Sequence, residues 1–339
     1  MRLENLRPFI IPLLLTQLAF AQTPTIGGIE LFGAPAAIIE KVRQSLEIKI
    51  GDPIPKSKIE LEDQIATAGN IARASVTAIC CVESKAILYI GIQEKEGEGL
   101  ELREEPAGTA ELPPKIVEAF TDFMNSLTGI MKTGVMNDDL SQGHSLAKDP
   151  KVRSFQLRFV TLASPNQGAL EDVLKNSASP EQRAIAAYVL GYSSNKKQVI
   201  EALRLGMIDP DEGVRGNAVR SLAAIAFFAQ KNARAGIAVD ANWFVAMLRS
   251  PSLADREKAA TTLVNLSDQR QAHILEPVRK NAVAAITEMA RWPSLEHALP
   301  AYILLGRIAG IDEKRLKGLW TAGQRETVIT EAAGVLAGK

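Results

Sequence analysis

The chain has 339 residues, of which 46% are hydrophobic and 23% are charged, and its 39 basic and 39 acidic side chains balance. These fractions are close to those of globular proteins, so the composition excludes a fibrous or an intrinsically disordered chain. The length is enough for about two domains.

Residues 1–21 differ in character from everything after them. Two arginines precede an almost unbroken apolar run from Pro8 to Phe20, which ends in the small-x-small pattern Ala19-Phe20-Ala21. The run is shorter than the about 20 residues that a membrane-spanning helix needs. We therefore predict a secretory signal that is cleaved before Gln22, with a retained membrane anchor as the alternative. The mature protein is then expected in the periplasm or outside the cell.

Residues 22–95 alternate between strand and helix patterns. Gly33 and Pro35 separate a first apolar run from a stretch with apolar residues at helical spacing, and Gly51-Asp52-Pro53 marks the turn after that helix. We predict a small α+β domain with the order β-α-α-β-β. Its strands are expected at 25–32, 74–82 and 86–93, and its helices at 36–46 and 56–68.

Several residues of this unit match a known pattern. The first strand contains Ile29-Glu30-Leu31-Phe32-Gly33, and Leu46 through Gly51-Asp52-Pro53 forms the step from the first helix into the turn. Leu61 lies in the second helix, and the last strand ends at Glu94. With these residues the unit resembles the POTRA domain of outer-membrane assembly factors and related periplasmic division proteins. The resemblance implies a module that binds proteins or peptides along an open sheet edge and has no catalytic role.

The two cysteines, Cys80 and Cys81, are adjacent in the second expected strand. Neighbouring Cα atoms lie about 3.8 Å apart, whereas disulfide-bonded residues usually need about 4.4 Å or more. Successive side chains of a strand also point to opposite faces. We therefore expect two free thiols, with a disulfide between two chains as the alternative.

Residues 96–147 connect this domain to the rest of the chain. Their first part, up to Pro114, is rich in Glu, Gly and Pro, which indicates a linker or an irregular edge. A helix is then expected at 115–131, because apolar residues recur there at core spacing. These residues are Ile116, Phe120, Phe123, Leu127 and Ile130.

Residues 148–338 repeat a short motif in which Asp or Ser precedes Pro and an arginine follows three to five residues later. Asp and Ser cap the free N–H groups of a helix and Pro is tolerated at its first position, so each pair predicts a helix start. The pairs are Asp149-Pro150, Ser179-Pro180, Asp209-Pro210 and Ser250-Pro251, and their arginines are Arg153, Arg183, Arg215 and Arg256. Partner helices are expected at 166–176, 196–207 and 241–249.

The third unit, from Asp209 to Leu222, contains Asp-Pro, then Val-Arg, and then Ala and Leu on one face. It resembles a HEAT repeat, although Arg183 of the preceding unit lies two residues closer to its proline. The resemblance implies an armadillo-like α-solenoid of HEAT-like helical hairpins with a concave binding face. It also implies that the motif arginines bond within or between repeats, which we expect rather than ligand binding.

One segment resembles a catalytic motif. Residues 143–147 (GHSLA) lack the last glycine of the G-x-S-x-G nucleophile elbow, which also requires a core strand before the serine. The preceding residues 136–142 are a polar run in which we predict no strand. We therefore do not expect Ser145 to be a nucleophile.

The chain has three histidines, His144, His273 and His297, and none has metal-ligand spacing to another His or to a Cys. It contains no H-E-x-x-H, no C-x-x-C and no phosphate-binding glycine loop. We therefore predict that the protein is not an enzyme and that it has no catalytic, cofactor-binding or metal-binding residues. The sequence does not assign the residues that bind a partner.

Charge is distributed unevenly along the chain. Residues 22–140 hold 11 basic and 19 acidic side chains, a net of −8, and residues 141–339 hold 26 and 19, a net of +7. The acidic part could mask the basic repeats or add contacts to a partner, and two ordinary solvated surfaces are the alternative. A mild positive charge does not indicate a nucleic-acid partner.

Together these patterns predict a mainly α fold, an α-solenoid of HEAT-like hairpins preceded by a small α+β, POTRA-like domain. We expect an exported, non-catalytic protein-binding scaffold or adaptor of the cell envelope. Its partner would be a protein or peptide in the periplasm or outer membrane. The alternatives are an enzyme, or a protein that handles a small ligand or chromophore on the concave face.

Overall fold

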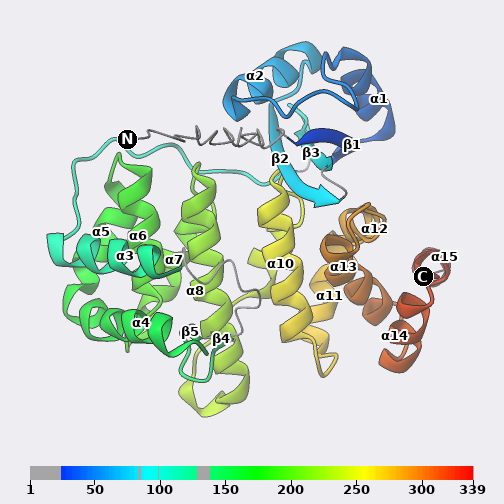
Figure 1. Ribbon diagram of the computed structural model, residues 1–339. Coiled ribbons are helices and arrows are strands. Elements are labelled where there is room, and N and C mark those ends of the chain that lie inside the picture. Colours follow the sequence, from blue (N-terminus) through cyan, green and yellow to red (C-terminus); the bar gives the residue numbers. More distant parts are fainter. Residues whose placement is uncertain (1–23, 83–84, 98, 128–137, 339) are drawn as a thin grey trace, which may run out of the picture.

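The computed structural model describes residues 24–82, 85–97, 99–127 and 138–338. Over these residues the chain is mainly α-helical, with a small three-stranded sheet followed by a long array of helices (Figure 1). The predicted fold class is confirmed. The signal predicted at residues 1–21 lies outside the described residues. No helix within the described ranges is long and apolar enough to cross a membrane.

The N-terminal domain has the predicted element order. Strand β1 (Thr25–Phe32) pairs in parallel with β3 (Lys85–Gln93), and β2 (Arg73–Val82) pairs with β3 in the antiparallel direction. Strand β3 is therefore central, and β1 and β2 are the two edges of the sheet.

Helices α1 (Ala36–Ser45) and α2 (Lys58–Gly69) belong to the core on one face of this sheet. Successive residues of β3 divide between two cores, as the period of a strand requires. Leu88, Ile90 and Ile92 pack with the two helices, whereas Tyr89 belongs to the core of the helical array. The sheet therefore buries both of its faces, which explains why β3 is apolar along nearly its whole length.

The expectation of two free thiols is wrong. Cys80 takes part in a disulfide bond. The argument from adjacency assumed a regular strand. The pairing of β2 with β3 instead shifts register between Ile79 and Val82. A bulge of this kind releases the residues within it from the regular alternation between faces.

Residues 99–113, part of the predicted linker, lie along the ends of the helical repeats, and we call them the strap. Their backbone is hydrogen-bonded to three separate places in the array. Arg103 N–H donates to Ile208 O at 2.8 Å, Gly108 N–H donates to Asn176 O at 2.8 Å, and Leu112 N–H donates to Gln182 Oε1 at 2.9 Å.

Helix α3 (Pro114–Leu127) follows the strap, and the end predicted for it at residue 131 lies outside the described residues. It packs against the first helices of the array rather than joining their rows. After it, the two-residue strands β4 (Asp138–Asp139) and β5 (Leu146–Ala147) pair with each other.

The array is a solenoid of two helix rows. The inner row, in which each helix contacts the next, is α4 (Pro150–Ala163), α6 (Pro180–Leu190), α8 (Glu212–Lys231), α10 (Leu253–Leu266), α13 (Leu295–Ile308) and α15 (Arg325–Ala337). The outer row is α5 (Gln167–Asn176), α7 (Lys196–Gly206), α9 (Ala241–Met247) and α11 (Ala272–Asn281). Helices α12 (Val283–Ala290) and α14 (Glu313–Thr321) pack on α13 and α15.

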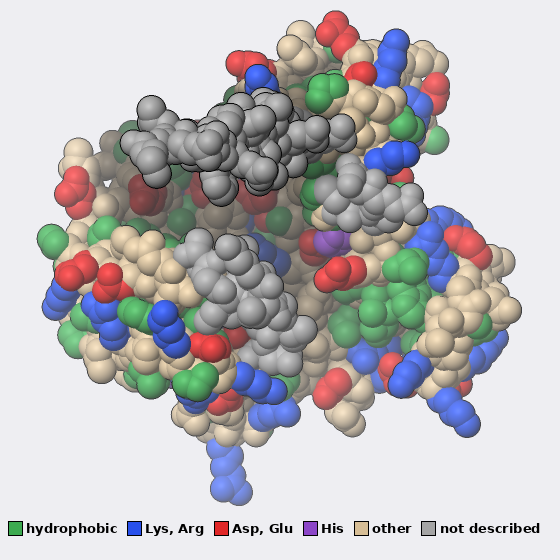
Figure 2. All heavy atoms as spheres, viewed as in Figure 1, with side chains coloured by type: hydrophobic (Ala, Val, Ile, Leu, Met, Phe, Trp, Pro, Cys, Tyr) green, Lys and Arg blue, Asp and Glu red, His purple; other side chains and the backbone are tan. Residues whose placement is uncertain are grey.

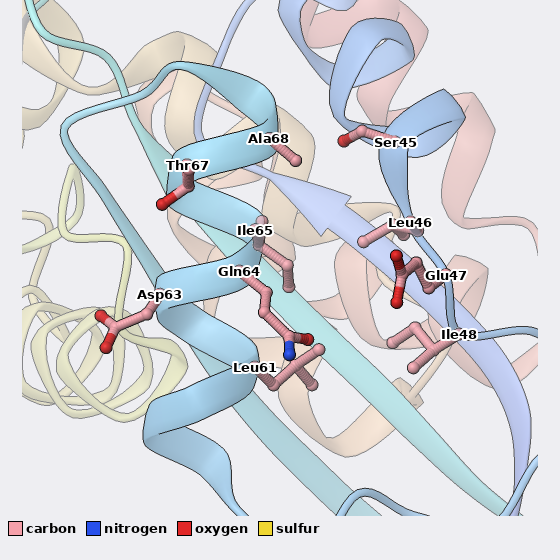
Figure 3. Close-up of a pocket in the computed structure, with 10 residues that line it drawn as sticks. All are labelled: Ser45, Leu46, Glu47, Ile48, Leu61, Asp63, Gln64, Ile65, Thr67 and Ala68. Atoms are coloured by element: carbon pink, nitrogen blue, oxygen red, sulfur yellow. The ribbon is translucent and has the colours of Figure 1, made fainter.

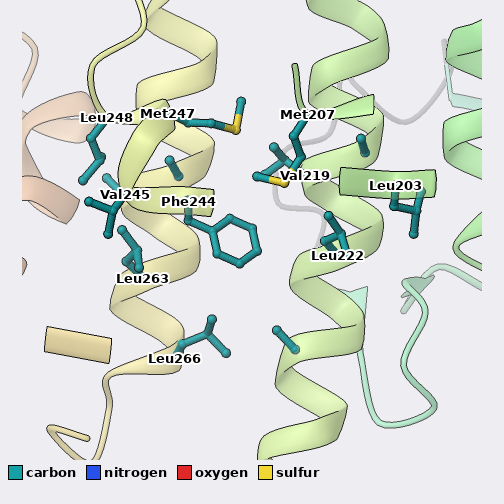
Figure 4. Packing of buried hydrophobic residues seen from close by; sticks show 14 of the residues in the cluster. Leu203, Met207, Val219, Leu222, Phe244, Val245, Met247, Leu248, Leu263 and Leu266 are labelled. Atoms are coloured by element: carbon teal, nitrogen blue, oxygen red, sulfur yellow. The ribbon is translucent and has the colours of Figure 1, made fainter. Parts of the chain in front are cut away.

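Figure 4 shows how apolar side chains fill the space between neighbouring repeats, with Phe244 of α9 lying between α10 and Leu222 of α8.

Two of the four predicted helix caps are correct and two are wrong. Asp149 and Ser179 cap α4 and α6, and the following proline occupies the first turn. In the next two units the cap is instead Asp211 or Ser252, two residues after the residue predicted. These are the units in which the arginine follows its proline by five residues rather than three. The longer spacing leaves the preceding Asp209 and Ser250 available for other bonds.

Three of the motif arginines form a ladder of bonds between repeats. Each guanidinium donates to a carbonyl of the loop before its own helix and to a carboxylate of the next repeat. Arg183 binds Ser177 O at 2.9 Å and Asp209 at 2.9 and 3.0 Å, Arg215 binds Asp209 O at 2.8 Å and Asp255 at 2.7 Å, and Arg256 binds Ser250 O at 2.6 Å and Glu288 at 2.9 Å. These three arginines therefore bond within and between repeats, as expected.

The last rung of this ladder holds the N-terminal domain. Arg256 lies over the ring of Phe32, with its guanidinium carbon 4.7 Å from the ring centre, and Trp292 meets the same ring at 5.1 Å. Glu288 also accepts the N–H of Gly33 at 3.0 Å. A Cβ atom at Gly91 would lie 1.8 Å from Pro251 O. The sheet therefore docks directly on the loops before α10 and α13, with α1 and α2 on the side away from the solenoid (Figure 1).

We predict that Arg183→Lys lowers the stability of the solenoid strongly. A lysine keeps the charge but cannot form the two parallel bonds to Asp209 and the bond to Ser177 O, so a loss of about 3 kcal/mol is expected. Arg204→Lys, on exposed α7, is the matched control and should cost below about 0.5 kcal/mol. The midpoint of chemical denaturation measures both. Equal midpoints for the two variants would contradict the ladder as a source of stability.

Candidate functional site

A groove runs over the inner row of the solenoid, and we call it the inner groove. Helices α6, α8 and α10 form its floor, and α3 forms a wall at one end. Its volume is about 820 Å³. The residues that line it belong to α3, to the segment around β4 and β5, and to those three helices, and none of the described residues of the N-terminal domain is among them. The described part of the acidic domain therefore leaves this groove uncovered.

Aromatic stacking fixes the wall of the inner groove. Phe123 of α3 lies 5.6 Å from Phe159 of α4 and 5.3 Å from Tyr188 of α6, measured between ring centres, and Phe120 lies 5.4 Å from Tyr188. Such packing holds α3 against α4 and α6. Met124, the residue after Phe123, also lines the groove and is 47% exposed. The wall is thus apolar and accessible.

The floor of the inner groove mixes polar side chains with small apolar ones. Asn217 of α8 and Thr261, Thr262 and Asn265 of α10 line it, together with Glu257 and Lys258 of α10 and with Val219, Ala223 and Ala224 of α8. Amide and hydroxyl side chains both donate and accept hydrogen bonds, which is the chemistry that a peptide backbone requires of a partner. On the face seen in Figure 2, basic and acidic side chains are interspersed rather than collected into one patch.

Ser145 lies at the edge of this groove, and its hydroxyl group bridges the two side chains of an ion pair. Arg220 of α8 binds Asp138 of β4 at 2.6 Å, and Ser145 bridges the two by donating to Asp138 and accepting from Arg220 at 2.9 Å. The Ser145 carbonyl accepts from the hydroxyl of Tyr192 at 2.7 Å. A two-residue strand, β4, does precede this segment where we predicted none, but it is not the core strand of a nucleophile elbow.

His144 does not serve Ser145 as a base in this arrangement. Its Nδ1 atom lies 3.3 Å from the ammonium group of Lys196. Burial, together with the charge of Lys196, lowers the pKa of His144 to about 4, so that the imidazole is neutral at pH 7. Burial likewise lowers the pKa of Lys196 to about 8. The ammonium also donates to Gly191 O at 2.7 Å, so these two residues help to fix the segment on α6 and α7.

His273 and His297 lie elsewhere in the solenoid, in α11 and α13. His297 pairs with Glu257 of α10. Among the described residues, no group of three or more His, Cys, Asp or Glu side chains is arranged to hold a metal ion. The sequence pattern alone did not identify Arg220, Asp138 or Met124 as site residues, because they come from three separate segments. The one local signal was the small side chains of α8, of which Gly216, Ala223 and Ala224 line the groove.

No protein-family model matches the chain, and a search of curated proteins finds no relative. Among solved structures, the designed armadillo repeat protein YIII(Dq)4CqI is 19% identical, with a TM-score of 0.35, over 58% of this chain and 98% of that chain. The designed armadillo repeat protein YIII(Dq.V1)4CPAF, solved in complex with the peptide (KR)4, is 20% identical, with a TM-score of 0.35, over 58% and 97%. The solenoid of the present chain is defined by its own helix rows and arginine ladder.

We predict that Ser145 is structural. Ser145→Ala should remove the bridge between Asp138 and Arg220 and cost about 1 to 2 kcal/mol of stability. Ser154→Ala, whose exposed hydroxyl on α4 donates to Lys151 O, should cost below about 0.5 kcal/mol. Peptide mapping after treatment with a fluorophosphonate probe should find Ser145 unlabelled. Covalent labelling of Ser145 in the folded protein would show a nucleophile and refute this role.

Proposed function

We propose that the protein is a non-catalytic scaffold that binds a segment of a partner protein in the inner groove. The observation that carries this proposal is the groove itself, which combines an apolar wall with a floor in which amide and hydroxyl side chains lie among small apolar ones. An extended segment could place an apolar side chain against Met124 and bond its backbone to the floor. The serine and the charged residues at the groove edge support a binding role rather than catalysis, because they bond to one another and to the backbone.

The N-terminal domain is proposed to be POTRA-like. Its β-α-α-β-β order and its mixed sheet with β3 in the centre support this, beside the residues that carry the resemblance. In this chain one face of the sheet is docked on the solenoid. We therefore propose that the domain is a rigidly attached part of the scaffold.

The binding proposal is tested by selecting peptides from an unstructured display library on the full-length protein. We expect Met124→Lys to weaken the selected peptides by at least about tenfold, because a charge in the apolar wall must be desolvated when a peptide binds. Leu157→Lys is the matched control, since Leu157 of α4 is also 47% exposed but does not line the groove. Peptides that bind both variants equally would refute the inner groove as the site.

Export to the cell envelope is proposed from residues 1–21 alone. The apolar run and the Ala19-Phe20-Ala21 pattern support cleavage before Gln22. The intact mass of the protein recovered from a periplasmic extract should correspond to a chain that begins at Gln22. A full-length mass in the membrane fraction would instead support the retained anchor, and a full-length mass in the cytosol would refute export.

A further inference from the structure

A second groove lies on the N-terminal domain, far from the inner groove, and we call it the module groove. It separates α2 from the segment that follows α1, and its volume is about 500 Å³. Figure 3 shows Leu46 and Ile48 on one side facing Leu61 and Ile65 of α2 on the other. The two α2 residues are buried beneath it. The floor of the module groove is therefore aliphatic.

Apolar side chains are also exposed on the two segments that border this groove. Ile50, two residues after Ile48, is 69% exposed, and Ile59, two residues before Leu61, is 71% exposed. No other large hydrophobic residue among those described is as exposed as these two. Ile50 belongs to the turn after Ile48 and Ile59 to the first turn of α2, so both lie beside the groove rather than in its lining. Exposed apolar side chains beside an aliphatic groove are typical of a surface that a partner covers.

The charges at the module groove have one sign. Glu47 and Asp63 are the charged residues that line it, and both are exposed. Acidic groups around an aliphatic floor favour a partner with basic groups beside apolar ones, because such a partner buries its apolar side chains while its charges meet opposite charges. A cavity of this volume has room for a few aliphatic side chains.

We propose that the module groove binds a short amphipathic segment of a partner protein, with two or more aliphatic anchors flanked by Lys or Arg. The aliphatic anchors enter between α2 and the residues after α1, and the flanking basic groups lie at Glu47 and Asp63. This site is independent of the inner groove. The protein thus offers two binding surfaces of different chemistry on one folded unit.

The test uses fluorescein-labelled peptides of about 12 residues and the full-length protein, with fluorescence anisotropy as the readout. One peptide carries two leucines flanked by lysines, the second has serine for leucine, and the third has glutamate for lysine. We expect the first peptide to bind at least about tenfold more tightly than the other two. Glu47→Lys combined with Asp63→Lys should weaken it by a similar factor. Glu60→Lys, an exposed change on α2 outside the groove, and Met124→Lys should not.

Three results would overturn the proposal. The first is no binding of the leucine-lysine peptide up to millimolar concentration. The second is equal binding of the serine peptide, which would show attraction by charge alone. The third is a concentration-dependent dimer in sedimentation that Asp63→Lys dissociates, which would assign the groove to a second copy of the chain. Because Met124→Lys reports only on the inner groove, failure here leaves the proposed function separately testable.

Discussion

The arrangement of the solenoid depends on its buried arginine ladder. The loop between two helices leaves carbonyl groups without helical partners, and a guanidinium has enough donors to satisfy several of them at once. Arg183, Arg215 and Arg256 each join such carbonyls to a carboxylate of the following repeat. A buried charge of this kind is costly unless its partners are all in place. The ladder therefore fixes the register between neighbouring repeats. It thereby also sets the spacing of α6, α8 and α10, and this spacing creates the inner groove.

The same ladder links the two domains. Arg256 bonds within the solenoid and also lies over Phe32, while its partner Glu288 accepts the N–H of Gly33. The N-terminal sheet completes the contact by turning Tyr89 toward Trp292 at 5.5 Å between ring centres. A sheet with helices on one face and solenoid on the other leaves only its edges and the outer sides of α1 and α2 for other partners. This is why the module groove, on the helical side, stays accessible.

Local patterns in the sequence predicted most of the fold. The strands of the N-terminal domain are within one residue of their expected positions, because strand patterns depend on nearby residues. Three of the four motif arginines bond between repeats, as the resemblance to HEAT repeats implied. Pairings across long separations were not predictable. Asp138 and Arg220 are 82 residues apart, and nothing in either segment indicates the other. The caps predicted for α8 and α10 were wrong for a related reason, because Asp209 accepts from Arg183 and Ser250 donates to Asp255 instead of capping a helix. The prediction for the cysteines was wrong because the sequence does not reveal the register shift between β2 and β3.

The strap has a mechanical consequence. Helical solenoids bend because each repeat contacts only its neighbours, so small rotations at successive interfaces add up along the array. The strap bonds to the ends of α5 and α7 and to the start of α6, and Arg103 reaches Asp209 in the ladder as well. A chain segment fixed at several points along one edge resists extension of that edge. The first repeats, from α5 to the loop before α8, are therefore braced against bending, and we expect the array to bend more readily at the helices that follow.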